Sequence, residues 1–240
     1  MTTSGTAAFN LDLSEIVEEA FERAGGELRT GYDLRTARRS LNLLFADWAN
    51  RGVNMWTFEQ GTINLVQGQA TYDLPNDTVD LLEHVIRTGA GNASTQADLT
   101  ITRISVSTYA TLPNKLARGR PIQVWIERLS GQTDPLLGAQ PAYPRITVWP
   151  VPDGSQPYQF VYWRMRRIQD AGTGVSNMDI PFRFLPCLTA GLAYYLALKI
   201  PEGMQRLDVL KAQYDEAWDL ASTEDREKAA VRLVPRSMVM

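Results

Sequence analysis

Apolar residues recur with helical spacing in the first fifth of the chain. Residues 13–24 place them on one face, after Asp12 and Glu15 in the arrangement of a capping box, and Gly25 follows as a stop signal. A second stripe occupies residues 33–51, and its apolar members are Leu34, Ala37, Leu41, Leu44, Phe45 and Trp48. Two amphipathic helices with a short link are expected to pack as an antiparallel pair, with Trp48 in the core.

The middle of the chain changes to short β-branched and aromatic runs, separated by Gly, Pro and Asn, which are typical of strands. The strands predicted from these runs are 55–58, 62–66, 70–74, 81–88, 99–104, 121–128, 145–149 and 159–166. A short helix capped by Ser105 is expected at 105–112, and residues 130–144 are predicted to form a long surface loop. The strands at 121–128 and 145–149 are expected to pair in antiparallel fashion.

Helical spacing returns at residues 182–199 and again at about 203–228. The fold class expected is therefore α+β, with a helical bundle made from the N- and C-terminal helices and a β-rich module inserted between them. The parts expected are a bundle of residues 11–53 plus 178–228, an inserted β-rich module of residues 54–177, and an extended C-terminal arm of residues 229–240.

Charge limits the possible partners. The chain has 240 residues, with 24 Lys and Arg against 27 Asp and Glu and a net charge of −3, whereas a protein that grips nucleic acid usually has a basic excess. Basic residues still gather in three places, namely Arg35, Arg38 and Arg39; Lys115, Arg118 and Arg120; and Arg164, Arg166 and Arg167. Contact with an acidic protein partner, or plain solvation, is favoured over nucleic-acid binding.

Metal and nucleophile chemistry have little to build on. The chain has one histidine, His84, and one cysteine, Cys187, which is too few for a zinc site. Neither a phosphate-binding glycine loop nor a G-x-S-x-G elbow is present in the sequence. His84 is expected to serve strand pairing or the surface, and Cys187 is expected to be a small buried hydrophobe.

The carboxylates do not suggest an active site either. Asp73, Asp77 and Asp80 lack the spacing of a calcium loop and are expected to serve turns and caps. The acids at 18–19 and 224–227 are expected on solvated helix faces or ends, without the apolar pocket that raises a catalytic pKa. No catalytic residue, metal or cofactor is therefore predicted, and the protein is not expected to be an enzyme.

The hydropathy pattern predicts no membrane segment. The most apolar window, residues 185–200, is 16 residues long, which is shorter than the roughly 18 apolar residues of a spanning helix. The first ten residues have neither a basic start nor an apolar run, so no secretory signal is expected. With a single cysteine, no disulfide can form within the chain, which agrees with synthesis in a cytoplasm.

Two stretches together carry a family resemblance. Residues 41–75 read LNLLFADWANRGVNMWTFEQGTINLVQGQATYDLP, and residues 181–236 begin with PFRFLPCLTAGLAYYLALKIPE and end with EDREKAAVRLVPR. They resemble the head-to-tail adaptor proteins of short-tailed phages, also described as tail accessory or packaged-DNA stabilisation proteins. The combination of motifs is more specific than any one of them, and residues 88–176 contribute nothing to the resemblance.

The resemblance implies a structural role in the neck of a virion made in the host cytoplasm. Similar proteins form rings of twelve copies that join the portal protein to the tail nozzle protein, so that DNA passes through the lumen without specific binding. Tail fibres are a further possible contact. The resemblance also implies a portal-binding arm, which consists here of Ala229, Ala230, Val231, Arg232, Leu233, Val234, Pro235 and Arg236.

The residues of this arm agree with such a role. Val231, Leu233 and Val234 are apolar, lack a helical stripe and follow a run of charged residues. A lone chain would leave them in water, whereas a groove on a partner would bury them. Two alternatives remain open from the sequence: a glycan-cleaving enzyme carried in the virion, and a module that attaches tail fibres.

Overall fold

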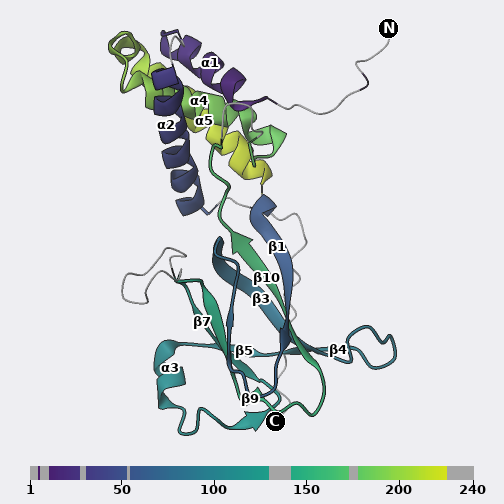
Figure 1. Ribbon diagram of the computed structural model, residues 1–240. Helices are drawn as coiled ribbons and strands as arrows, with labels where there is room; N and C mark the ends of the chain where they lie inside the picture. The colour runs from purple at the N-terminus through teal and green to yellow at the C-terminus, as the bar shows by residue number, and fades with distance from the viewer. Residues whose placement is uncertain are drawn as a thin grey trace, which may run out of the picture. The chain divides into compact units, whose positions relative to one another are not determined.

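The structure is a computed structural model, and it describes residues 5, 11–27, 31–52, 55–129, 142–172 and 178–225. The chain divides into two compact units. One comprises Met1–Trp56 and Ile168–Met240, and the other comprises Thr57–Arg167. The first is helical and the second is rich in β-strands, which confirms the expected α+β class (Figure 1). The predicted arm, residues 229–240, lies outside the described residues.

The helical unit is built around one apolar helix. Its helices are α1 (Leu13–Ala24), α2 (Gly31–Asn50), α4 (Leu185–Ala197) and α5 (Leu207–Glu224), with 3-10 turns η3 (Phe182–Phe184) and η4 (Pro201–Arg206) before α4 and α5. The sequence of α4 contains no charged residue and is buried on most of its surface. A helix that is apolar all round must be enclosed, and α4 accordingly contacts α1, α2 and α5.

The start of α1 has the expected local geometry. The Asp12 carboxylate accepts from the Glu15 backbone N–H, and the Glu15 carboxylate accepts from the Asp12 backbone N–H, both at 2.9 Å. Gly25 ends the helix in the left-handed conformation at φ 88°, which glycine adopts without steric cost. The capping box and stop signal predicted from the sequence are confirmed.

Trp48 lies at the centre of the helical core. Its side chain has no solvent exposure, and its indole N–H donates to the Tyr214 hydroxyl at 3.0 Å. The rings of Phe184 and Trp218 each lie 5.5 Å from it, measured between centroids. Gly191 of α4 permits this close packing, because a Cβ there would lie 2.9 Å from the Tyr214 ring.

The second unit contains two four-stranded sheets and a two-stranded sheet. Its elements are β1 (Phe58–Leu65), β2 (Thr71–Asp73), β3 (Thr78–Thr88), β4 (Ala97–Thr100), β5 (Thr102–Ile104), α3 (Val106–Thr111), β6 (Arg118–Gly119), β7 (Gln123–Glu127), β8 (Arg145–Trp149), β9 (Val151–Pro152) and β10 (Tyr158–Arg166). The strand orders are β1-β10-β3-β4, β2-β8-β7-β5 and β6-β9. Side chains from both four-stranded sheets share one core, in which Ile86, Ile146 and Phe160 are fully buried.

Several predicted elements of this unit are confirmed. The helix α3 is capped by Ser105, whose hydroxyl accepts from the Thr108 backbone N–H at 3.2 Å. The strands β7 and β8 pair in antiparallel fashion, as expected for residues 121–128 and 145–149. The alternating run near residues 159–166 forms β10, the strand between β1 and β3.

Other predicted elements are wrong in ways that have physical causes. The two strands expected at 55–58 and 62–66 are a 3-10 turn, η1 (Met55–Thr57), followed by the single strand β1. Gly61 does not break β1, because its missing side chain leaves room for the Tyr162 ring opposite, 2.3 Å from where a Cβ would lie. The single strand expected at 99–104 is divided: β4 pairs with β3, whereas β5 joins the other sheet beside β7.

The C-terminal helices also differ from the prediction at their ends. The helix expected at 182–199 consists of η3 followed by α4, and the helix expected at about 203–228 consists of η4 followed by α5, which ends at Glu224. Pro186 and Pro201 stand near the starts of α4 and η4, at positions where proline needs no amide donor. Among the described helices, none is long and apolar enough to cross a membrane.

Candidate interaction surfaces

The first half of α2 carries an exposed basic surface, here called the α2 arginine face, which consists of Tyr32, Arg35, Arg38 and Arg39. These four side chains line an open depression, and Tyr32 is 64% exposed. The guanidinium groups donate only to neutral oxygens of Gly31, Gly172 and Thr36, at 3.2 to 3.3 Å. Within the described part of the chain, none of these arginines forms an ion pair with a carboxylate.

The pKa of a lysine beside this face is affected by the positive charge of one of the arginines. The Lys199 ammonium donates to the Ser40 hydroxyl at 2.7 Å, between α2 and the end of α4. Burial lowers the pKa of Lys199, and the positive charge of Arg39 lowers it further. Unneutralised cations destabilise one another, so the α2 arginine face carries a charge that the described part of the helical unit does not compensate.

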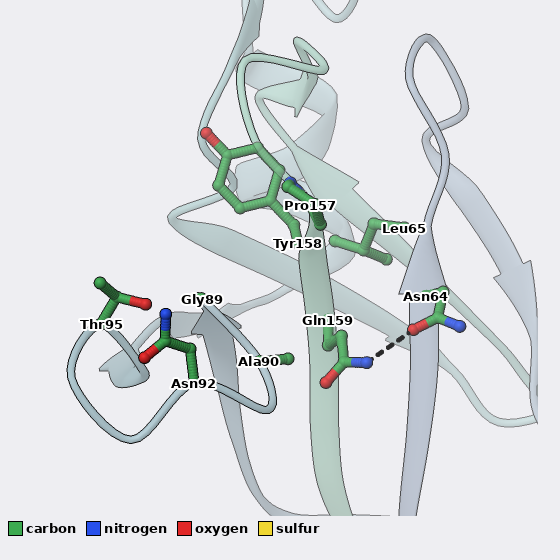
Figure 2. A pocket seen from close by; sticks show the side chains of 9 residues that line it. All are labelled: Asn64, Leu65, Gly89, Ala90, Asn92, Thr95, Pro157, Tyr158 and Gln159. Carbon is green, nitrogen blue, oxygen red and sulfur yellow. Dashed lines mark hydrogen bonds between the residues drawn. The ribbon is translucent and has the colours of Figure 1, made fainter.

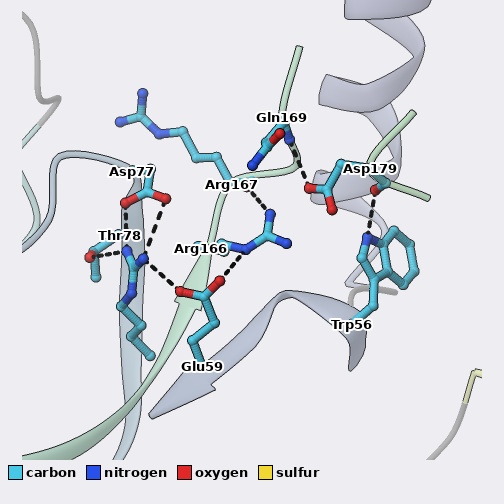
Figure 3. A network of polar contacts seen from close by, with 9 residues as sticks. Trp56, Glu59, Asp77, Thr78, Arg166, Arg167, Gln169 and Asp179 are labelled. Carbon is cyan, nitrogen blue, oxygen red and sulfur yellow. Dashed lines mark hydrogen bonds and ion pairs between the residues drawn. The ribbon is translucent and has the colours of Figure 1, made fainter. Parts of the chain in front are cut away.

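The arginines of β10 have the opposite environment. The Glu59 carboxylate accepts from Arg164 and from Arg166, each at 2.7 Å, and Asp77 and Thr78 accept from Arg164 as well (Figure 3). The side chains of Arg164 and Arg166 are only 11% and 12% exposed. Burial alone would raise the pKa of Asp77, but the hydrogen bond and charge of Arg164 lower it below its usual value. The folded state therefore favours the ionised form of the Asp77 carboxylate.

The aspartates that the sequence placed in turns have mixed roles. Asp77 lies in the turn before β3, as expected. Asp80 lies within β3 instead, and its carboxylate forms ion pairs with Arg103 at 3.0 Å and Arg128 at 3.4 Å. In the regions that the structure describes, no group of three or more acidic, histidine or cysteine side chains could hold a metal ion.

Of the two residues considered for nucleophile chemistry, Cys187 is buried and His84 is half-buried. His84 pairs with Tyr162 across β3 and β10, and its ring stacks on Phe160 with centroids 5.9 Å apart. Burial lowers the pKa of His84, and neither ring nitrogen has a hydrogen-bond partner among the described residues. Burial raises the pKa of the Cys187 thiol to about 12, so the thiol is unreactive at neutral pH.

The end of α5 contains an ion pair that the sequence did not reveal. Asp225 was expected at a solvated helix end, but its carboxylate is fully buried and pairs with the Arg183 guanidinium. The two residues are 42 positions apart, so no local pattern could predict the pair. This contact holds the end of α5, four residues before the predicted arm begins in the sequence.

The outward side of α5 is acidic. Asp208, Asp215, Glu216 and Asp219 are all exposed, and none of them forms an ion pair with a described residue. Leu220 beside them is 70% exposed and lines a groove between α1, α4 and α5. The helical unit thus presents one basic helix face and one acidic helix face, both without a partner in the described chain.

The β-rich unit has a depression of a different character (Figure 2). It is lined by residues of β1, β10 and the loop after β3, namely Asn64, Leu65, Gly89, Ala90, Asn92, Thr95, Pro157, Tyr158 and Gln159. The Gln159 amide donates to the Asn64 amide oxygen at 2.9 Å. None of these lining residues carries a carboxylate, so this depression has no acid–base pair for glycan cleavage.

The helical unit and the β-rich unit each have a packed core, and the helical unit also carries exposed charged surfaces. A family model described as SU10 adaptor protein matches residues 11–236, and the chain belongs to that family. It is thus a phage adaptor protein, a virion component in a family with a structural role, which associates with other virion components such as portal and tail. No curated protein matches the chain. The match spans the sequence of the predicted arm, Ala229 to Arg236.

Proposed function

We propose that the protein is a head-to-tail adaptor that forms a ring of twelve copies between the portal and the tail nozzle and thereby forms part of the DNA conduit. The observation that carries this proposal is the family match over residues 11–236. The helical bundle, the β-rich module and the arm would then be its working parts. The unpaired charged faces of the helical unit support a protein that is completed by partners.

In this proposal the arm binds the portal. Burial of Val231, Leu233 and Val234 in a groove would be worth roughly 1.5–3 kcal/mol each before the cost of ordering the chain. The buried pair of Asp225 and Arg183 supports the idea, because it holds the end of α5 four residues before the arm begins in the sequence. Many modest arms around a ring would attach strongly, since each binding event raises the effective concentration of the next.

The net charge agrees with a conduit. Each copy carries −3, and a ring multiplies that value by its copy number. A lumen with a negative potential repels phosphate and lets DNA slide. A glycan-cleaving enzyme has less support, because the depressions described above contain no facing pair of carboxylates. A fibre-attachment role for the depression of the β-rich unit has no observation that favours it.

Removal of residues 229–240 tests the arm. The truncated protein should fold normally by circular dichroism and lose binding to its cognate portal ring. A matched pair of full-length variants separates apolar contact from charge. Val231, Leu233 and Val234 changed together to Ser should abolish binding, whereas Arg232 and Arg236 changed to Gln should retain most of it. Undiminished portal binding by the truncated protein would rule out the arm.

A further inference from the structure

The α2 arginine face forms no ion pair with a carboxylate among the described residues of its own copy. Its members fall within an arc of about 120° on the helix, on the side opposite Ala37, Leu41 and Leu44, which face the core. Three guanidinium groups and the nearby Lys199 therefore concentrate positive charge on one outward surface. Because these guanidinium groups form no ion pair with a described carboxylate, the surface is available to an external partner of opposite charge.

The acidic surface on α5 forms a regular stripe. Asp208, Asp215 and Asp219 follow at steps of seven and four residues, so they lie within an arc of about 40° on the helix. Glu216 lies beside them, and Lys211 is the only exposed base of this helix. We call Asp208, Asp215 and Asp219 the α5 acidic stripe. Its spacing was visible in the sequence as an i, i+7, i+11 pattern.

Arg39 of the basic face and Asp215 of the acidic stripe are well separated within one copy. The C-terminal end of α2 is the part that meets α5, because Arg51 lies over the Trp218 ring at 4.7 Å and senses the charge of Asp215. Arg39 is 12 residues earlier, which is about 18 Å along the helix axis. This separation exceeds the screening length of about 8 Å at physiological salt.

We propose that the α2 arginine face of one copy binds the α5 acidic stripe of the next copy in the ring. This inference rests on the proposed ring and names the contact that closes it. The charges are complementary, and the spacing matches: Arg35 and Arg39, like Asp215 and Asp219, are four residues or about 6 Å apart. Two different surfaces in contact give a head-to-tail interface, which is the kind that generates rings.

Single-stranded or duplex DNA is the competing partner for the basic face. DNA would neutralise arginines through phosphate contacts, but it would leave the α5 acidic stripe unexplained and would be repelled by it. A second copy accounts for both unpaired faces at once. The two possibilities make different predictions for charge reversal, because a second copy requires both faces and DNA requires only one.

Charge reversal in two complementary variants tests the contact. R35E/R39E makes both faces acidic, and D215R/D219R makes both faces basic. Each variant alone should show at least a tenfold increase in the concentration needed to form rings on the cognate portal, because like charges would meet at every interface. An equimolar mixture should restore assembly, since opposite charges then meet wherever the two variants alternate. The control E18R/E22R reverses two exposed acids of α1 at the same spacing and should assemble normally.

Cross-linking supplies a second measurement that does not depend on reversed charges. R39C/D219C should give a ladder of covalent oligomers beyond the dimer with a short bismaleimide, while each single-cysteine variant should give none. Cys187 should not interfere, because its thiol is buried and unreactive. The cross-linking reaction is run on portal-bound protein. The stoichiometry of the wild-type ring on the portal is measured first, so that the ring itself is established before cross-linking.

The outcomes separate this inference from the proposed function. Failure of the wild-type protein to form a ring on the portal would contradict the proposed function. A wild-type ring with no restoration in the mixture and no ladder would overturn the contact alone. Loss of binding to a DNA duplex in R35E/R39E, with normal ring assembly, would assign the basic face to DNA and also overturn it.

Discussion

The arginines of α2 and of β10 are similar clusters in sequence but opposite in structure. Arg164 and Arg166 are nearly buried, and each donates to the Glu59 carboxylate. Arg35, Arg38 and Arg39 are exposed and donate only to neutral oxygens. A buried cation must be paired because its desolvation is costly, whereas an exposed one can stay unpaired in water. The β10 cluster therefore serves the fold, and the α2 cluster is available for a partner.

The core of the helical unit should show the largest effect on stability. Trp48→Ala removes a fully buried indole that contacts three aromatic rings, and it should lower the free energy of unfolding by about 3 kcal/mol or more. Tyr214→Phe is the matched control, since it removes only the hydrogen bond and should cost about 1 kcal/mol. Hydrogen exchange at α2 amides measures both. A loss below about 1 kcal/mol for Trp48→Ala would contradict its central position.

Loss of the central β10 arginine should come next. Arg164→Gln leaves the Asp77 and Glu59 carboxylates without their main partner, and we expect a loss of about 2 kcal/mol in the unfolding free energy of the β-rich unit. Arg145→Gln provides the control, because Arg145 pairs with Glu127 but is 42% exposed, and such pairs contribute about 1 kcal/mol or less. Urea unfolding followed by hydrogen exchange in β3 distinguishes them. Equal losses of unfolding free energy in the two variants would contradict the distinction between buried and exposed ion pairs.

Acidic pH should remove the stability that the pairing of Arg164 with Asp77 contributes. Arg164 lowers the pKa of Asp77 below its ordinary value near 3.8, so the folded state favours the ionised carboxylate. The resulting stability is present above the unfolded pKa and is lost as pH falls through the folded pKa. The difference in unfolding free energy between wild type and Arg164→Gln should therefore shrink between about pH 5 and pH 3. A difference that stays constant over this range would show that Asp77 does not carry it.

Neutralising the α2 arginine face should have the smallest effect on stability. With Arg35, Arg38 and Arg39 all changed to Gln, the unfolding free energy should change by no more than about 0.5 kcal/mol. None of the ion pairs between described residues is lost, and the repulsion between Arg39 and Lys199 is relieved. Thermal unfolding at low and moderate salt measures this change. A loss as large as that of Arg164→Gln would assign the α2 cluster to the fold.

The sequence predicted what depends on local pattern. Helical spacing, the capping box at Asp12 and the apolar character of α4 predicted the helices of the helical unit. The alternation of side chains along residues 159–166 predicted β10. The division of residues 99–104 between two sheets was not predictable, because it depends on which distant strands are available for pairing. Gly61 marked an apparent break until its partner Tyr162, about 100 positions away, was known.

The candidate surfaces follow the same rule. Three basic clusters were visible in the sequence, but their roles depend on acids far along the chain: Arg164 pairs with Glu59 at a separation of 105 residues. The burial of Asp225 against Arg183 had no local signal for the same reason. The acidic stripe of α5 did have one, in its helical spacing, and could have been found by a search for polar as well as apolar periodicity.

The central claim, that this phage adaptor assembles as a ring on the portal, is tested most directly by the mass of the complex formed with the cognate portal ring. Native mass spectrometry of the mixture should show one copy of this chain for each portal subunit, with free protein monomeric or only weakly associated. Absence of binding by the folded protein, or a complex that contains only one or two copies per portal, would contradict the account.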